Sequence, residues 1–180
     1  MKVLRGRDRI AIIFPLIKMV IKLPQIHIFK SFFQLYGYAK ENNWKGIIID
    51  WSWPLELKTG FKGLLFHGIA ENWREFLFFF KTRNEFLQPT FFSFFGLFNI
   101  QLYGNPCGMN YVDLWRQLIE LTDGRAWQDN HHFSNPDNFC YHSKKFRILD
   151  YGNPQCHEVI NLYGKKIVKE FDPNYKKERK

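Results

Sequence analysis

Three oxygen-bearing side chains flank a hairpin pattern in the last third of the chain. Asn138 precedes the β-rich run Phe139–Tyr141, and Asp150 follows the run Phe146–Leu149. A hairpin of this length returns the chain on itself, so we expect Asn138 and Asp150 to lie side by side. Mg²⁺ accepts amide and carboxylate oxygens as ligands while it keeps positions for water and phosphate. Asp129, shortly before the hairpin, could accept a hydroxyl proton near the same cation.

Two strand patterns near the start of the chain carry a candidate cation. The runs Arg9–Phe14 and Ile17–Leu23 are rich in β-branched and aromatic residues, and a proline turn separates them. Alternation along the second run places Lys22 on the same face as Val20. The apolar run is broken by charges and lacks a small-residue cleavage site, which favours folded strands over a secretion signal.

A helical pattern carries a candidate acidic partner. Apolar residues recur at helical spacing over Gly68–Lys81, and Glu75 lies in this segment. The runs Phe91–Phe95 and Leu97–Tyr103 then predict two paired strands around a glycine.

The patterns around the hairpin are mainly helical. Asn110 is predicted to cap a helix over Tyr111–Thr122, and the last predicted helix covers Gln155–Phe171. The segment Asp129–Asn138 is predicted to be a polar loop. Residues 25–65 give mixed signals, with a possible helix over Ile28–Ala39 and a β-rich run over Gly46–Asp50.

The run Asp150-Tyr151-Gly152 resembles the Asp-Phe-Gly motif of the kinase-like phosphotransferase superfamily, which includes protein kinases and small-molecule kinases of the aminoglycoside type. In that family a catalytic Asp precedes a metal-binding Asn, a β-hairpin and this motif. Val20-Ile21-Lys22 resembles the strand lysine motif, and Glu75 matches the helix glutamate that pairs with that lysine. The resemblance implies ATP and Mg²⁺ as cofactors, Lys22 and Glu75 as nucleotide-binding residues, Asn138 and Asp150 as metal ligands, and Asp129 as the catalytic residue.

The resemblance also implies a fold. It predicts an α+β, reduced kinase-like two-lobe fold in which residues 1–172 form a single domain. The amino-terminal lobe, about 1–104, would hold a small antiparallel sheet with one helix and an insertion at about 25–65. A short, mainly helical carboxyl-terminal lobe would cover about 105–172, and a basic tail would follow at 173–180.

Three departures from the family pattern bear on activity. Asp129 and Asn138 are nine positions apart, where the family motif has five. Gly6 alone precedes the first strand pattern, where the family has a glycine-rich phosphate loop. No Ala-Pro-Glu motif follows Asp150, and 30 residues remain after it. The resemblance therefore favours a small-molecule acceptor over a protein substrate.

Two functions follow from these motifs. The first is a Mg-ATP-dependent phosphotransferase whose acceptor the sequence does not identify. The alternative is a catalytically weak pseudokinase, or a binding or structural module that acts through a protein or nucleic-acid partner. The departures from the family pattern favour this alternative.

The composition is that of a basic, aromatic-rich globular chain. It has 180 residues, a formal net charge of +9, and 20 Phe, 8 Tyr and 6 Trp, which excludes disorder over most of the length. Three cysteines without a Cys-x-x-Cys pair argue against a disulfide framework or a thiolate zinc site. No apolar run is long enough to span a membrane, and we expect a cytoplasmic protein.

Two further readings concern charge and metal. The basic tail at 173–180 allows a weak electrostatic contact with nucleic acid. His131 and His132, close to Asp129, could suggest a zinc site. Because adjacent residues on a strand point to opposite faces, we expect these histidines to position the loop instead.

Overall fold

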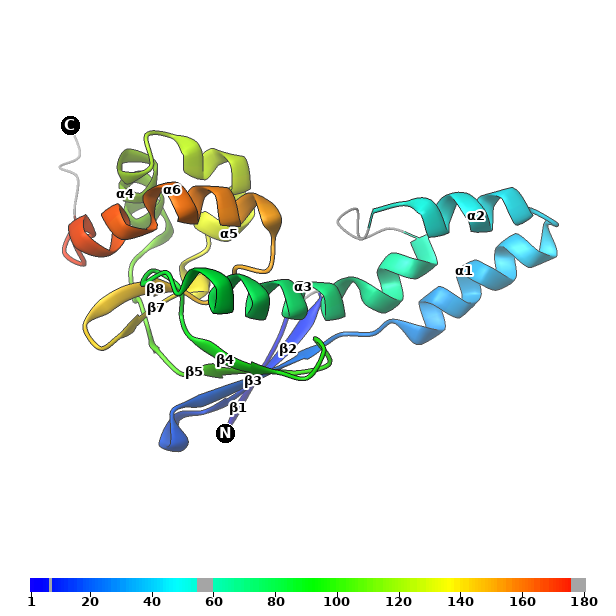
Figure 1. Ribbon diagram of the computed structural model, residues 1–180, viewed down its shortest axis with the longest axis horizontal. Coiled ribbons are helices and arrows are strands. Elements are labelled where there is room, and N and C mark those ends of the chain that lie inside the picture. Colours follow the sequence, from blue (N-terminus) through cyan, green and yellow to red (C-terminus); the bar gives the residue numbers. More distant parts are fainter. Residues whose placement is uncertain (7, 55–59, 176–180) are drawn as a thin grey trace.

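The computed structural model describes residues 1–6, 8–54 and 60–175, which form a mixed α/β structure (Figure 1). An antiparallel sheet has the strand order β1-β2-β3-β5-β4. Its strands are β1 (Lys2–Arg5), β2 (Arg9–Phe14), β3 (Met19–Pro24), β4 (Thr90–Ser93) and β5 (Asn99–Leu102). In this register Ala11 of β2 lies opposite Lys22 of β3. The predicted antiparallel sheet is therefore confirmed.

Several boundaries of the predicted strands are wrong. The strand predicted over Phe91–Phe95 covers Thr90–Ser93, and the strand predicted over Leu97–Tyr103 covers Asn99–Leu102. The second strand begins at Met19 rather than Ile17, because Pro15–Ile17 forms the 3₁₀ turn η1. This turn ends with Lys18 in the left-handed backbone conformation, at φ 53°. Lys18 therefore lies outside the strand, whereas Lys22 keeps its place in it.

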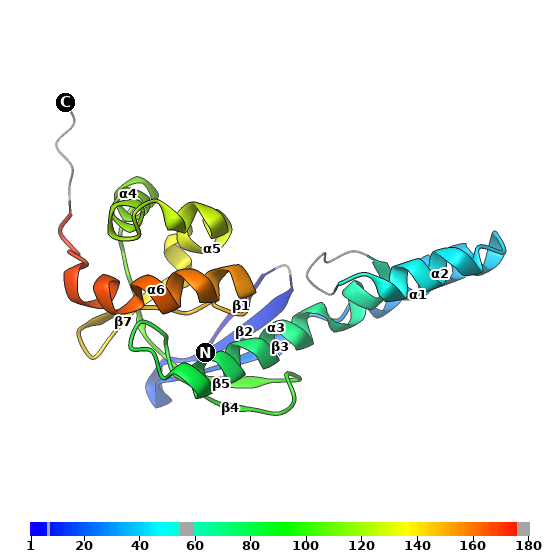
Figure 2. The ribbon, with the colours of Figure 1, turned by 45° about the horizontal axis from the view of Figure 1, so that its top comes forward.

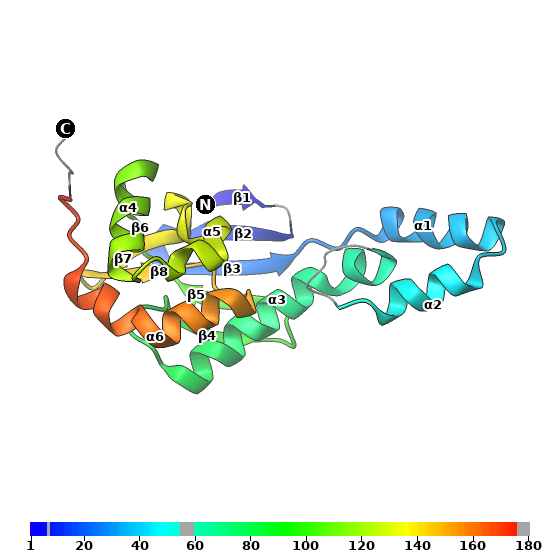
Figure 3. The ribbon, with the colours of Figure 1, turned by 90° about the horizontal axis from the view of Figure 1, so that it is seen from above.

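The long helix α3 (Gly60–Thr82) packs against β3, β4 and β5 (Figure 3). It contains the predicted helix and begins eight residues before Gly68. The buried Asn72 fixes its position, because its Nδ2 donates to the carbonyl oxygen of Gly96 at 3.0 Å. Asn99 of β5 donates through Nδ2 to the Asn72 carbonyl oxygen at 2.7 Å. These amide contacts hold the helix at a fixed depth on the sheet.

Two helices, α1 (Ile28–Lys40) and α2 (Trp44–Ser52), project from the sheet together with the first turns of α3 (Figures 1 and 2). The predicted helix over Ile28–Ala39 is confirmed. The β-rich reading of Gly46–Asp50 is wrong, because this run lies in α2. Asn43 caps α2 by accepting a hydrogen bond from the Gly46 amide at 2.9 Å, and the helix packs against α1 and α3.

A buried carboxylate holds this helical projection together. Asp50 accepts hydrogen bonds from Gln34 Nε2 at 3.0 Å and Tyr38 hydroxyl at 3.3 Å, both on α1. It also accepts from the Phe61 amide at 3.2 Å, at the start of α3. One side chain thereby joins three helices, and it satisfies an amide at the amino-terminal end of α3 that has no intrahelical partner.

The remainder of the described chain combines helices with a three-stranded sheet, ordered β6-β7-β8. Its strands are β6 (Asn105–Pro106), β7 (Phe139–His142) and β8 (Lys145–Ile148). Its helical segments are α4 (Tyr111–Leu121), η3 (Arg125–Asp129), α5 (Asn130–Phe133), η4 (Pro136–Asn138) and α6 (Pro154–Glu170). The predicted hairpin and the two predicted long helices are confirmed, and Asn110 caps α4 by accepting from the Asp113 amide.

The hydrophobic core is centred on this second part and extends to Phe78 and Phe79 of α3 and to Phe86 and Leu87. Phe133, Leu118 and Ile160 are among its fully buried side chains, contributed by α5, α4 and α6. The prediction of a polar loop over Asp129–Asn138 is wrong, because the segment forms short helical turns that bury Phe133 and His132. The burial of Phe133 in the core explains why this stretch is ordered.

Backbone hydrogen bonds join the two parts. The Ile148 amide donates to the Phe86 carbonyl at 2.8 Å, and the Gln88 amide donates to the Ile148 carbonyl at 2.9 Å. Strand β8 is therefore tied to the segment that leads into β4. Among the described residues, no helix has the length and apolar character needed to cross a membrane.

Candidate functional site

A cavity of about 380 Å³ lies between the five-stranded sheet and the β7–β8 hairpin. Strands β1, β2 and β3 give it an apolar wall that includes Leu4, Ala11, Ile13 and Val20. The segment from Tyr103 to Pro106 also lines it. Its charged and amide side chains are Lys2, Arg9, Lys22, Gln101, Asp137, Asn138 and Asp150. An apolar pocket with a few convergent polar groups is typical of a small-molecule site.

Lys22 and Glu75 form a buried ion pair beside this cavity. Lys22 Nζ donates to Glu75 Oε1 at 2.8 Å and Oε2 at 2.9 Å, and also to the Leu149 carbonyl at 2.6 Å. Glu75 is fully buried and Lys22 nearly so. Burial lowers the pKa of Lys22, although Glu75 acts to raise it. The ammonium thus connects the sheet, helix α3 and the end of the hairpin.

Arg9, at the start of β2, joins three carboxylates. Its Nη1 donates to Glu75 Oε2 at 2.7 Å, its Nη2 donates to Asp150 Oδ1, and its Nε lies 3.8 Å from Glu71 Oε2. Burial opposes the charge on Arg9, but Asp150, Glu75 and Glu71 outweigh burial and raise its pKa. Arg9 therefore carries a fixed positive charge between the ion pair and Asp150.

Sequence reasoning missed Arg9, although the strand pattern contained a signal. Alternation along β2 places Arg9 on the same face as Ala11 and Ile13, and all three line the cavity. Pairing of β2 with β3 places Ala11 opposite Lys22. The two predicted strands, once paired, would therefore have brought the guanidinium near the ammonium.

Asp150 follows β8 and lines the cavity. Burial acts to raise the pKa of its carboxyl, but Arg9, His132 and Lys22 outweigh burial and hold it well below the usual range. The carboxylate is therefore charged at neutral pH, as a cation ligand must be.

The two residues after Asp150 fix its position. Tyr151 is fully buried, and its hydroxyl contacts the Gln88 carbonyl at 2.7 Å and Thr90 Oγ1 at 2.8 Å. A Cβ on Gly152 would lie 2.7 Å from the Glu71 carbonyl oxygen, so only glycine fits against α3 there. The Asp150-Tyr151-Gly152 run is thus clamped between the strand β4 segment and α3.

Asn138 lies at the entrance of the hairpin. Its carbonyl oxygen accepts from the Leu149 amide at 2.7 Å, which places it beside the residue before Asp150. Its Nδ2 donates to the His132 carbonyl at 3.1 Å, and its amide oxygen is the atom that remains for a cation. Asn138 and Asp150 line the same cavity.

Asp129 lies behind His132 rather than on the cavity wall. Its Oδ1 accepts from His132 Nδ1 at 2.7 Å, and its side chain is buried. His132 Nε2 lies 3.8 Å from Asp150 Oδ1. Burial opposes the charge on His132, but the hydrogen bond that His132 donates to Asp129 and the charge of Asp150 outweigh burial and raise the pKa of His132.

The structure thus brings Lys22, Glu75 and Asp150 into one network through Arg9. Asn138 lines the same cavity, whereas within the part of the chain that the structure describes Asp129 is linked to the network through His132. Sequence reasoning assigned neither His132 nor the exposed, cavity-lining Asp137 to the site. No protein family model, curated protein or solved structure matches the chain.

Proposed function

We propose that the chain is a Mg-ATP-dependent phosphotransferase of reduced kinase-like fold, with a small-molecule hydroxyl as the acceptor. One observation carries this proposal: Lys22, Glu75, Arg9 and Asp150 meet in a single network beside one cavity. Phosphoryl transfer depends on positioning and charge stabilisation rather than on covalent chemistry. Two fixed cations next to a charged carboxylate supply the charge stabilisation.

The donor set fits a magnesium nucleotide. In the proposed complex the apolar wall formed by Ala11 and Val20 receives the base, and Lys22 and Arg9 neutralise the phosphates. Asn138 and Asp150 offer the oxygen ligands that Mg²⁺ prefers. Arg9 and Asp150 contact each other, and phosphate and Mg²⁺ would each take one partner of this pair.

A second candidate is a binding module that holds nucleotide without transferring phosphate. Asp129 is buried against His132 and does not line the cavity. The family spacing counted back five positions from Asn138 reaches Phe133, whose apolar side chain is fully buried in the core. Both observations favour the loss of the catalytic base.

Thermal unfolding with ATP tests the binding part of the proposal. We expect ATP to raise the melting temperature only when Mg²⁺ is present, because Asp150 would hold the Mg²⁺ that offsets the phosphate charge. The change Asp150→Asn should abolish the Mg²⁺-dependent increase, measured from the melting temperature of each unliganded variant. The exposed Asp123→Asn change is the control and should keep it. Absence of an ATP effect in the parent protein contradicts the proposal.

Turnover separates the two candidates. ATP consumption with a panel of hydroxyl-bearing small molecules, followed by detection of a phosphorylated product, selects the phosphotransferase. Mg²⁺-dependent binding with no product selects the binding module. Lys22→Met should weaken nucleotide binding in either case, while the exposed Lys165→Met change should leave it unaltered.

A further inference from the structure

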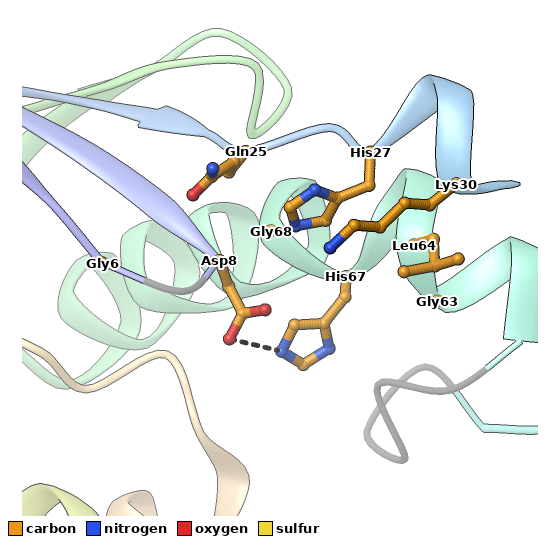
Figure 4. Close-up of a pocket in the computed structure, with 9 residues that line it drawn as sticks. All are labelled: Gly6, Asp8, Gln25, His27, Lys30, Gly63, Leu64, His67 and Gly68. Atoms are coloured by element: carbon orange, nitrogen blue, oxygen red, sulfur yellow. Dashed lines mark ion pairs between the residues drawn. The ribbon is translucent and has the colours of Figure 1, made fainter.

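A second cavity, of about 320 Å³, lies between the β1–β2 turn, the start of α1 and helix α3 (Figure 4). Asp8 of the turn and His67 of α3 both line it and point toward each other. His67 and Glu71 are four residues apart on α3, so they lie on one face of the helix. Two of these residues thus come from one helix and the third from a turn far away in the sequence.

The three side chains have the spacing of a metal site. His67 Nε2 lies 3.0 Å from Glu71 Oε1 and 4.0 Å from Asp8 Oδ2, and the three ligand atoms are all within 4.8 Å of one another. Tetrahedral Zn²⁺ binds nitrogen and oxygen at about 2.0–2.1 Å, which separates its ligand atoms by about 3.3 Å. The observed separations bracket this value, and His67 and Glu71 are buried.

We propose that Asp8, His67 and Glu71 bind one Zn²⁺ ion, with the fourth position open to the cavity. Imidazole and carboxylate ligands suit this ion, and three protein ligands with one open position form a known zinc arrangement. This site is separate from the Mg²⁺ ligands of the proposed function and does not depend on that function.

The local charge favours a divalent cation. Two carboxylates, those of Asp8 and Glu71, lie beside His67, at 4.0 Å and 3.0 Å from its Nε2. Buried charges are stable only when they are paired or bound to a metal.

The backbone holds the third ligand in place without help from the ion. The Gly6 amide donates to the Arg9 carbonyl at 2.9 Å across the turn, and the Gln25 amide donates to the Asp8 carbonyl at 2.8 Å. A Cβ on Gly68 would lie 2.4 Å from that carbonyl oxygen, so α3 and the turn touch at this point. The ion would therefore lock the β1–β2 turn onto α3.

Metal binding to chelator-treated protein tests the site. We expect Zn²⁺ to bind with a stoichiometry of one and to raise the melting temperature, whereas Mg²⁺ without nucleotide should not. Co²⁺ should give the visible absorption of a tetrahedral site. His67→Gln and Asp8→Asn should weaken Zn²⁺ binding by about 100-fold or more, since even indirect partners of zinc ligands change affinity by 10–100-fold. His131→Gln, an exposed histidine, is the control.

Three results would overturn this assignment: no Zn²⁺ binding in the parent protein, unchanged affinity in both ligand variants, or loss of binding in the His131→Gln control. Circular dichroism of each variant checks that it is folded. None of these measurements uses nucleotide. Absence of a zinc site would therefore not contradict the proposed function, and absence of nucleotide binding would not contradict the zinc site.

The helical projection exposes apolar side chains, and these support a second inference that is independent of the zinc site. On α1 the side chains of Ile28, Phe29, Phe32, Phe33 and Tyr36 are 56–80% exposed, and they form one stripe at positions i, i+1, i+4, i+5 and i+8. Helix α2 exposes Trp44, Ile48 and Trp51 at i, i+4 and i+7. Large contiguous apolar surfaces mark interaction sites.

The charged residues around this stripe indicate which partner binds it. The exposed charged residues of the projection are mainly basic. Among described positions 26–54 and 60–66, the exposed basic residues are Lys30, Lys40 and Lys45, and the exposed acidic residue is Glu41. A second copy of the chain would bring like charges together. An anionic bilayer supplies the opposite charge, and aromatic side chains with flanking lysines are typical of helices that lie in the membrane interface.

We infer that the α1 stripe binds the surface of an anionic membrane. Sedimentation with vesicles tests this: the protein should bind phosphatidylcholine vesicles that contain phosphatidylglycerol and bind pure phosphatidylcholine at least tenfold more weakly. The changes Phe29→Ser with Phe33→Ser, or Lys30→Glu with Lys45→Glu, should each lower binding at least tenfold. The control Leu16→Ser with Leu162→Ser alters exposed apolar residues elsewhere and should bind as the parent does.

Absence of binding to anionic vesicles, or equal binding by the stripe variants, would overturn this inference. Light scattering of the free protein checks the competing occupant. A dimer that dissociates in the Phe29→Ser, Phe33→Ser variant would assign the stripe to a second copy instead.

Discussion

At the residue scale, the candidate site is stabilised by ion pairs in which one charged side chain contacts two oppositely charged partners. Glu75 receives hydrogen bonds from both Lys22 and Arg9, and Arg9 also reaches Asp150. A buried ion is stable only while its partners remain, because removal of one partner leaves the other charge in a medium of low dielectric constant. Each member of this network therefore affects stability as well as ligand binding.

The change Glu75→Gln tests this coupling. It leaves Lys22 and Arg9 buried with one anionic partner fewer, so we expect a loss of about 3 kcal/mol in the free energy of unfolding, measured by urea denaturation. The matched control Glu158→Gln removes an exposed carboxylate on α6 and should change it by less than about 0.5 kcal/mol. Equal, small effects in both variants would contradict the buried pair.

The thiols give a second residue-scale prediction. Burial raises the pKa of all three thiols, to about 12 for Cys140 and well above the usual value for Cys156, but Cys107 is only half-buried. Because the thiolate is the reactive form, we expect only Cys107 to react with a disulfide reagent at pH 8. All three should react in urea, and Cys107→Ser should remove the native reaction. Rapid reaction of two or more native thiols would refute the packing around β7 and α6.

At the scale of elements, helix α3 does most of the positioning. It carries Glu71 and Glu75 toward Arg9, and it contacts both the sheet and the run after β8. Gly152 is the closest point of this contact, since its missing Cβ makes room for the Glu71 carbonyl. The position of Asp150 therefore depends on a backbone-to-backbone approach.

Gly152→Ala should disturb this approach. The new Cβ would lie 2.7 Å from the Glu71 carbonyl oxygen, and backbone atoms cannot move aside without shifting α3. We expect a lower melting temperature and a smaller Mg-ATP effect. Gly37→Ala in α1 places its Cβ in open space and should keep or raise the melting temperature, because alanine favours helices. A harmless Gly152→Ala change would show that the run lies farther from α3.

Elements with strong local signals could be predicted from sequence. The hairpin, the strand β2 and the helix capped by Asn110 each follow from patterns within a few residues. The structure of Gly46–Asp50 could not be predicted in this way, because its consecutive isoleucines favour a strand. The run is helical because it packs against α1 and α3. At the site, motifs pointed to Lys22 and Asp150, but nothing near Arg9 in the sequence indicates its carboxylate partners.

At the scale of the whole molecule, the helical projection and the rest of the chain have separate stabilising contacts. Helices α1 and α2 pack against each other and against α3. Asp50 is a buried polar link among them, through Gln34, Tyr38 and Phe61. The cavity with Arg9 and Asp150 uses none of these residues. Changes in the projection should therefore leave the candidate site intact.

Hydrogen exchange of an Asp50→Ala variant measures this independence. Loss of the carboxylate leaves three donors without their acceptor, at about 1–3 kcal/mol each. We expect amides of α1 and α2 to exchange at least tenfold faster, with β2 and β3 unchanged. Asp123→Ala, at an exposed position, should alter neither region. Faster exchange throughout the sheet would show that the two regions unfold together.

The contact between Arg9 and Asp150 also has a consequence for synthesis on the ribosome. Their positions are 141 residues apart, and translation at about 5–20 residues per second separates their appearance by roughly 7–28 s. In the later part of that interval, after Glu75 has been added, Arg9, Lys22 and Glu75 exist without Asp150, and the amino-terminal sheet must persist with an incomplete charge network. Nascent chains in which Asp150 is still inside the ribosomal exit tunnel should therefore be cleaved by protease more readily than chains in which it has emerged.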